Sequence, residues 1–161
     1  MAIDMFFKLD GIKGEATDSK HKDEIDIESF TFGVHQTGSS HRGGHGLGAG
    51  RAEFQDVMIT KYADKASPPL MEHCAKGAHI KTAQITVRKA GGKQEEGYKV
   101  HFHDLIISSF TNTGSSEKDS LVETISLNYS GIQFEYAPQS ADGTLGGSVK
   151  GGWHLRENKP M

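Results

Sequence analysis

The sequence has little of several features that would point to a function. Only one of its 161 residues is a cysteine, Cys74, which excludes an intrachain disulfide and a multi-cysteine zinc site. Its 18 lysines and arginines are outnumbered by 21 aspartates and glutamates. The resulting net charge of −3 gives no electrostatic basis for binding nucleic acid. No stretch approaches the roughly 20 apolar residues that a membrane helix needs, so we expect no membrane insertion.

Large apolar residues are also scarce. Leucine, isoleucine, valine and phenylalanine together account for 33 residues, close to the roughly 20% below which chains tend to be disordered. Such a small core favours further burial at subunit interfaces. Glycine, in contrast, is abundant, with 20 residues against only four prolines. This composition favours a turn-rich β protein over a helical one.

The first residues do not have the pattern of a signal peptide. They carry no basic segment, an acid stands at Asp4, and their apolar run is short. A single cysteine also fits folding in a reducing compartment. Composition therefore predicts a cytoplasmic protein.

Alternating apolar residues predict seven or eight strands. The chain does not alternate between strands and helices, which argues against a parallel, doubly wound sheet. We expect a bulge near Ser29 and changes of parity after Phe102 and at residues 130–131, where the alternation shifts by one residue. The predicted strand regions are residues 3–9, 25–34, 54–62, 83–87, 98–107 and 121–136, with a hairpin turn at residues 88–92.

One short helix is expected at residues 67–77. Ser67 is a favourable N-cap, Pro68 suits the first helical position, and Gly77 suits the position after the helix. Leu70 and Cys74 share one face. The predicted fold is therefore mainly β, with two antiparallel sheets forming a barrel or sandwich and one short flanking helix. We expect residues 1–161 to form a single domain.

Residues 35–51 predict a long flexible loop, because six of them are glycines. Residues 44–49 loosely match a dinucleotide-binding fingerprint. That motif works only between a buried strand and a helix N-terminus, whereas residues 52–61 have the pattern of a strand. We therefore expect an interaction loop and no nucleotide cofactor.

Histidines raise the question of a metal site. His35, His41 and His45 lie close in the sequence, and His101 and His103 share one face of a strand. A metal site needs several converging ligands with supporting contacts, and no third ligand accompanies the strand pair. The sequence also lacks a nucleophile elbow, a Walker loop, HExxH and EF-hand spacing. We therefore predict no catalytic residue, no metal ligand and no enzymatic activity.

Several short segments resemble one known family. In this order and over nearly the full length, the chain resembles the haemolysin-coregulated proteins, Hcp, which are tube proteins of the bacterial type VI secretion system. The glycine-rich loop at residues 38–50 resembles the family as well. The matching segments are MAIDMFFK at 1–8, GIKGE at 11–15, TKYADKASP at 60–68, VRKAGG at 87–92 and GGWHLR at 151–156.

The resemblance implies a structural role in an assembly. A two-sheet β barrel with a flanking helix would form a homo-hexameric ring, and rings would stack into a tube similar to a phage tail tube. A contractile sheath would surround the tube, a spike protein would cap it, and effector proteins would travel in its lumen. The subunit would assemble in the bacterial cytoplasm and then be secreted to the extracellular space or into a target cell.

The glycine-rich loop is the expected contact between stacked rings. Arg42 and Arg51 bracket it, and each could meet a carboxylate such as Asp18 or Glu24 on the adjacent ring. The alternative is a monomeric β-barrel module that binds a ligand or carbohydrate. Such a module needs an aromatic-lined pocket, and one tryptophan and four tyrosines are few residues to build a site in which a sugar stacks on aromatic rings. The residues of the predicted stacking loop are Arg42, Gly43, Gly44, His45, Gly46, Leu47, Gly48 and Arg51.

Overall fold

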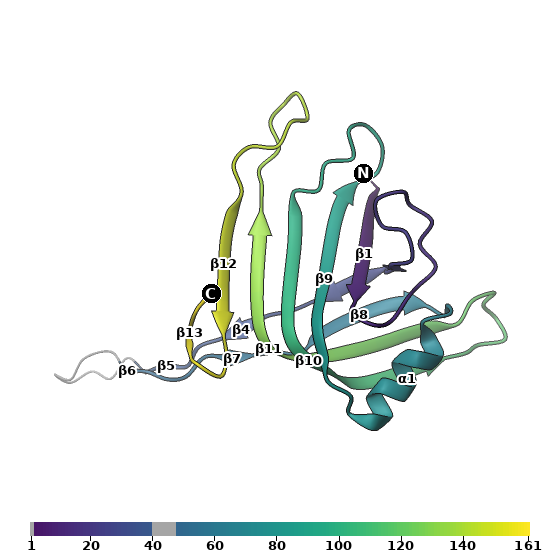
Figure 1. Cartoon of the computed structure of the whole chain (residues 1–161), viewed down its shortest axis with the longest axis horizontal. Coiled ribbons are helices and arrows are strands. Elements are labelled where there is room, and N and C mark those ends of the chain that lie inside the picture. The colour runs from purple at the N-terminus through teal and green to yellow at the C-terminus, as the bar shows by residue number, and fades with distance from the viewer. Residues whose placement is uncertain (1, 40–47) are drawn as a thin grey trace.

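The structure is a computed structural model that describes residues 2–39 and 48–161. Within these residues it contains one helix and thirteen strands, and it confirms the expected mainly β fold with antiparallel sheets (Figure 1). No helix of the described residues is long and apolar enough to span a membrane. The elements are β1 (Ile3–Leu9), β2 (Ile25–Asp26), β3 (Ser29–Thr31), β4 (Val34–His35), β5 (Gly38–Ser39), β6 (Gly48–Ala49), β7 (Glu53–Phe54), β8 (Val57–Tyr62), α1 (Ser67–Lys76), β9 (Ile80–Lys89), β10 (Tyr98–Thr113), β11 (Val122–Tyr136), β12 (Val149–His154) and β13 (Lys159–Pro160).

Two long strands, β10 and β11, bend and thereby join two sheet layers. Their halves at residues 98–105 and 129–136 lie in an upper layer with the order β12-β11-β10-β9-β1. Their other halves lie in a lower layer with the order β10-β11-β8-β3 (Figure 1). The sheet folds over without closing into a barrel within the chain. Asp104, with φ of 48°, lies where burial in β10 changes parity.

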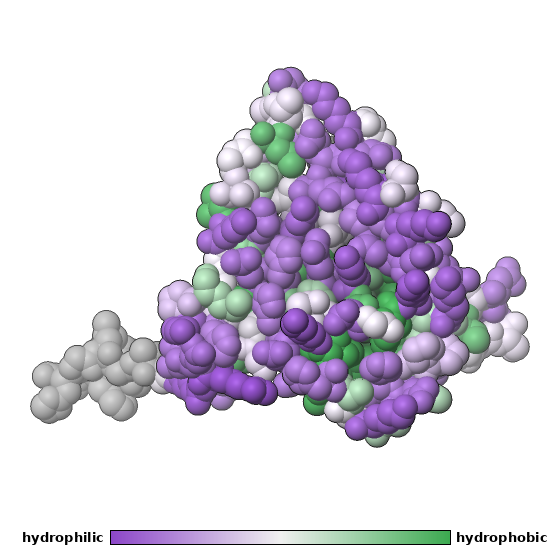
Figure 2. All heavy atoms as spheres, viewed as in Figure 1, coloured by the Kyte–Doolittle hydropathy of each residue, from purple (hydrophilic) through white to green (hydrophobic). Residues whose placement is uncertain are grey.

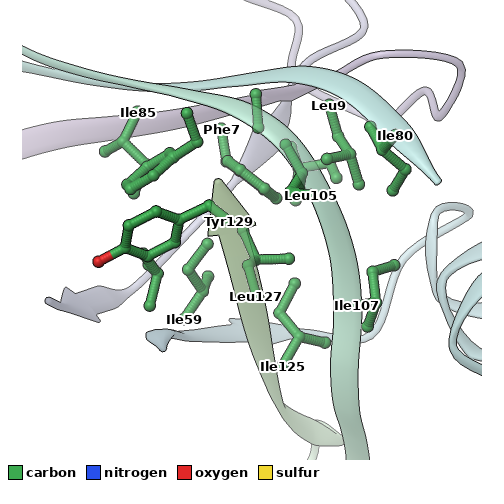
Figure 3. Packing of buried hydrophobic residues seen from close by; sticks show 14 of the residues in the cluster. Phe7, Leu9, Ile59, Ile80, Ile85, Leu105, Ile107, Ile125, Leu127 and Tyr129 are labelled. Carbon is green, nitrogen blue, oxygen red and sulfur yellow. The ribbon is translucent and has the colours of Figure 1, made fainter. Parts of the chain in front are cut away.

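The core lies between the two layers. Phe7 and Ile85 come from the upper layer, and Ile59, Ile125 and Leu127 come from the lower layer; all five are fully buried. Figure 3 shows these side chains directed into one continuous cluster. Each side chain of this size stabilises the fold by about 1.5–3 kcal/mol when buried. The alternation in the sequence therefore marks the inner faces of both layers.

The predicted bulge near Ser29 marks a place where the chain changes layer. Ile25 and Asp26 of β2 pair with β1 in the upper layer. Only three residues later, β3 pairs with β8 in the lower layer, with Ser29 opposite Thr60. The expected strand at residues 25–34 is thus three short strands, because each segment pairs with a different partner: β2 with β1, β3 with β8 and β4 with β7.

The helix begins differently from the prediction. Ser67 is its first residue, Ala66 is the N-cap, and no side chain caps the helix. The amide of Leu70, which we expected Ser67 to cap, donates to the carbonyl of Ala66 at 2.9 Å. The Ser67 hydroxyl instead donates to Glu123 at 2.5 Å. The N-cap prediction was wrong because a buried carboxylate binds this hydroxyl.

The end of the helix agrees with the sequence. Gly77 has φ of 60°, and its amide donates to the carbonyl of Cys74. A Cβ at this position would meet no atom within 4 Å, so backbone conformation alone opposes a side chain there. We expect Gly77→Ala to lower the free energy of unfolding by about 1 kcal/mol, and Gly77→Asn by less, because Asn tolerates the left-handed region. Urea unfolding measures both; equal losses would contradict the conformational explanation.

Candidate assembly interface

The lower layer has two open edges. Beyond Leu105, no strand of the described residues pairs with the side of β10 that faces away from β11. At the other edge, β3 pairs with β8 and with no other described strand. Open edges present unpaired backbone N–H and C=O groups, which favour pairing with another chain.

The face of the lower layer that points away from the core is rich in hydroxyl groups. Ser29, Thr60, Thr124 and Thr111 lie opposite one another across all four strands. A second row beside it contains Thr31, Met58, Ser126 and Ser109. Neither row includes a charged side chain. We call these two rows the hydroxyl face.

An arm extends from the lower layer at one end of the longest axis of the molecule (Figure 1). It consists of residues 34–39 and 48–54, in which β4 pairs with β7 and β5 pairs with β6. Arg51 joins the arm to the C-terminal segment, because its guanidinium donates to the carbonyl of Leu155 at 2.8 Å. The arm therefore has a fixed attachment at its base.

A buried polar network lies at the opposite end of the lower layer. Lys61 of β8 and Glu123 of β11 are both fully buried, and their Nζ and Oε1 atoms are 2.6 Å apart. Lys61 also contacts the Asp64 carboxylate at 2.9 Å. The second oxygen of Glu123 accepts from the Asn112 amide at 2.9 Å, and Ser67 donates to the first. We call these five residues the Glu123 network.

The network keeps Glu123 ionised. Burial by itself would raise the pKa of this carboxyl group. Hydrogen bonds from Lys61, Ser67 and Asn112, together with the charge of Lys61, hold the pKa below its ordinary value. Lys61 and Glu123 continue the alternating buried positions of their strands, and this opposite-charge pair at core positions is the signal by which the sequence could have revealed them.

Comparisons with known proteins identify the family. Residues 6–136 match the family "Type VI secretion system effector, Hcp". Protein hcp1 of Pseudomonas aeruginosa is 44% identical over 160 residues, which cover 98% of each chain. The chain belongs to the Hcp family. It is therefore a secreted tube protein of the type VI secretion system, as its sequence resemblance implied.

Solved structures of the Hcp family share the fold. A "type six secretion system protein" superposes with a TM-score of 0.94 at 31% identity, over 99% of this chain and all of that chain. Hcp1 from Salmonella typhimurium superposes with a TM-score of 0.83 at 35% identity, over the whole of both chains. The bent two-layer sheet is thus the Hcp fold.

Only part of the predicted stacking loop lies in the described residues. Gly48 begins β6, and Arg51 lies between β6 and β7 in the arm. The remaining loop residues, Arg42, Gly43, Gly44, His45, Gly46 and Leu47, lie outside the described residues.

The acids that we expected to receive the loop already have partners. Both oxygens of Asp18 accept from the Arg88 guanidinium, one of them at 3.2 Å, and this contact lowers the pKa of Asp18. Glu24 binds the ring of His21 within the chain. Ring stacking through these two acids would have to compete with these contacts within the chain.

The strand histidines do not form a metal site. Among the described residues, no group of three or more histidine, cysteine, aspartate or glutamate side chains could hold a metal ion. His101 lies 3.7 Å from a carboxylate oxygen of Glu135 on the neighbouring strand. Burial lowers the pKa of His101, which outweighs the opposing effect of Glu135. This histidine is a partly exposed residue of the upper layer.

An apolar cavity of about 220 Å³ lies between the arm and the upper layer. Phe32, Phe54, Phe134 and Trp153 are among its lining residues, and the Trp153 indole is the single polar side chain there. Carbohydrate recognition requires several hydrogen-bonding groups that fix orientation. The cavity therefore gives little support to the alternative of a sugar-binding module.

Proposed function

We propose that this chain closes into a homo-hexameric ring through its two open edges and that these rings stack into a tube. The observation that carries the proposal is the direction of the edge strands. All neighbours in the order β10-β11-β8-β3 are antiparallel, so β3 runs opposite to β10. Placed beside β10 of the next subunit, β3 continues the antiparallel alternation without interruption.

This pairing is heterologous, because one edge of each subunit meets the other edge of its neighbour. Heterologous contacts form a closed ring when the rotation between neighbours completes a circle. Closure also satisfies the edge groups that the single chain leaves unpaired. The number six comes from the family and not from the strands themselves.

The proposed ring has the hydroxyl face on its inside. The upper layer lies on the other side of the lower layer (Figure 1), and Leu70 of α1 belongs to the core cluster. We place the hydroxyl face at the lumen, because the core and the upper layer cover the other face of the lower layer. The face of the chain seen in Figure 2 is mostly hydrophilic, with apolar atoms gathered where β10 and α1 lie. A lumen wall with uncharged hydroxyl rows would let effector proteins of either charge pass.

The arm is the proposed contact between rings. It projects at one end of the long axis, while the turn between β10 and β11 projects at the other (Figure 1). Rings stacked in the same orientation bring these ends together. The predicted loop from Arg42 to Arg51 belongs to this contact, with Gly48 and Arg51 in its described part. A surrounding contractile sheath, a spike protein at the tip and assembly in the cytoplasm before secretion complete the proposed role, which needs no catalytic site.

Blocking one edge at a time tests the ring. Lysines at an edge oppose strand pairing. We expect Ser29→Lys/Thr31→Lys, which blocks β3, and Thr111→Lys/Thr113→Lys, which blocks β10, each to abolish hexamers. An equal mixture of the two should form a heterodimer, because each variant keeps the edge that the other needs. Native mass spectrometry distinguishes these species.

A control carries the same added charge away from both edges. Ser115→Lys/Ser116→Lys in the β10–β11 turn should still form hexamers. Hexamers of either edge variant, or a mixture that stays monomeric, would contradict closure through β3 and β10.

A further inference from the structure

The half of β10 that forms the proposed ring edge begins with an irregularity. Ile107 lies opposite Leu127, but Ser109 lies opposite Ser126, so Ser108 is an extra residue in β10. The bulge lies shortly after β10 has lost its pairing with β9 at Leu105. Beyond it, β10 has a strand partner, β11, on one side only among the described residues, although α1 also packs against β10. A strand in this position could shift its register unless specific contacts fix it.

Polar side-chain contacts hold this half of β10 to β11 on both faces of the sheet. On the hydroxyl face, the Ser109 hydroxyl lies 2.5 Å from the Ser126 hydroxyl. On the core face, Asn112 donates to Glu123 at 2.9 Å. Asn112 is exposed on the edge strand, whereas Glu123 is fully buried. The exposed edge is thus connected directly to the buried network.

Glu123 connects this edge to two further elements. Its Oε1 atom binds Lys61 of β8 and Ser67 of α1, and its Oε2 atom binds Asn112 of β10. An apolar pair at these positions would pack the same elements without the cost of burying charges. Apolar contacts, however, are not directional. Hydrogen bonds to both oxygens of one carboxylate specify a single arrangement of β8, β10 and α1.

We propose that the Glu123 network is a register lock that sets the edge of β10 for pairing with β3 of the next subunit. Glu123 and Asn112 are positioning residues: they act on the ring through the backbone of β10 and do not themselves contact the neighbour. This inference rests on the proposed ring and assigns to a buried ion pair a role in assembly. The contribution of the network to ring closure is separate from its contribution to the stability of the subunit.

The variant Lys61→Met/Glu123→Leu separates the two roles, because it replaces the ion pair by apolar side chains of similar size. We expect its thermal unfolding midpoint as a subunit to stay close to that of the wild type. We expect its ring association constant, measured by sedimentation, to fall at least tenfold. Amide hydrogen exchange at residues 109–113 should be faster in the monomeric variant than in the wild-type subunit. A folded variant that forms rings as tightly as the wild type would overturn the proposal.

A milder variant decides the question if the double variant does not fold. Asn112→Ala leaves the Lys61–Glu123 pair in place and removes only the bond to the edge. Asn128→Ala is its matched control: Asn128 on β11 donates to Asp56 at 2.8 Å and does not contact Glu123. We expect the Asn112 variant to weaken ring association at least threefold more than the control. Equal effects would overturn the lock, whereas a monomeric wild type would instead contradict the ring itself.

Discussion

Lys61→Met is expected to lower the free energy of unfolding by about 3–5 kcal/mol, one of the two largest effects that the structure predicts. Lys61 is the cation that faces both Glu123 at 2.6 Å and Asp64 at 2.9 Å. Its removal leaves the fully buried Glu123 carboxylate with neutral hydrogen-bond donors alone. Urea unfolding of the purified variant measures the loss.

The double variant Lys61→Met/Glu123→Leu is the control for this prediction. Replacing both charges by apolar groups is often neutral or stabilising, because neither charge is then buried without a partner. We expect the double variant to regain most of the stability that Lys61→Met loses. A double variant as unstable as the single one would show that packing around Lys61, and not the unpaired carboxylate, causes the loss.

The pH dependence of unfolding follows from the same carboxylate. The folded protein lowers the pKa of Glu123, so the unfolded chain binds its proton more readily. The stability that ionised Glu123 contributes is present above the ordinary glutamate pKa of about 4.3 and is lost as pH falls through the lowered pKa. In Lys61→Met this carboxylate no longer has a buried cation. The difference in free energy of unfolding between the wild type and Lys61→Met should therefore shrink below about pH 4. A difference that stays constant with pH would contradict this account.

Replacement of residues 42–49 by a short Gly-Ser link is expected to abolish tube formation while leaving hexamers intact. The replacement removes β6 (Gly48–Ala49), which pairs only with β5 (Gly38–Ser39) in a sheet separate from the lower layer. The proposed lateral contacts at β3 and β10 are therefore untouched. Each stacked pair of rings would lose six equivalent contacts, so small individual terms add to a large effect.

Two measurements decide the result of this replacement. Native mass spectrometry reports the ring, and electron microscopy reports tube length under conditions that favour stacking. Monomers would show that the loop belongs to the lateral contact instead, and tubes of normal length would show that it has no role in assembly. Arg51→Ala is a useful comparison, because Arg51 also holds the carbonyl of Leu155.

Much of the fold could be predicted from local patterns in the sequence. The alternation of Phe7 and Leu9, or of Ala83 and Ile85, follows directly from a strand with one buried face. Gly77 could be recognised because a left-handed residue after a helix favours glycine. Such signals are local, and the physics that creates them acts over only a few residues.

The parts that could not be predicted depend on contacts between distant residues. Ser67 has the pattern of an N-cap, but its hydroxyl binds Glu123, which lies 56 residues away. Lys61 and Glu123 are charged residues of the kind usually found on an exposed surface. Their positions in the alternating pattern of β8 and β11 nevertheless place them on the buried face. The open edges likewise follow from which strands pair, and no single strand reveals this. The function was recognised through ordered family motifs instead of through a site.

The native mass of the unmodified chain tests the central claim most directly. Native mass spectrometry or sedimentation at micromolar concentration should show a closed ring, because the open edges of β3 and β10 have complementary directions. The Hcp resemblance sets the expected number of chains in that ring at six. A protein that stays monomeric under these conditions would contradict ring closure through these two edges.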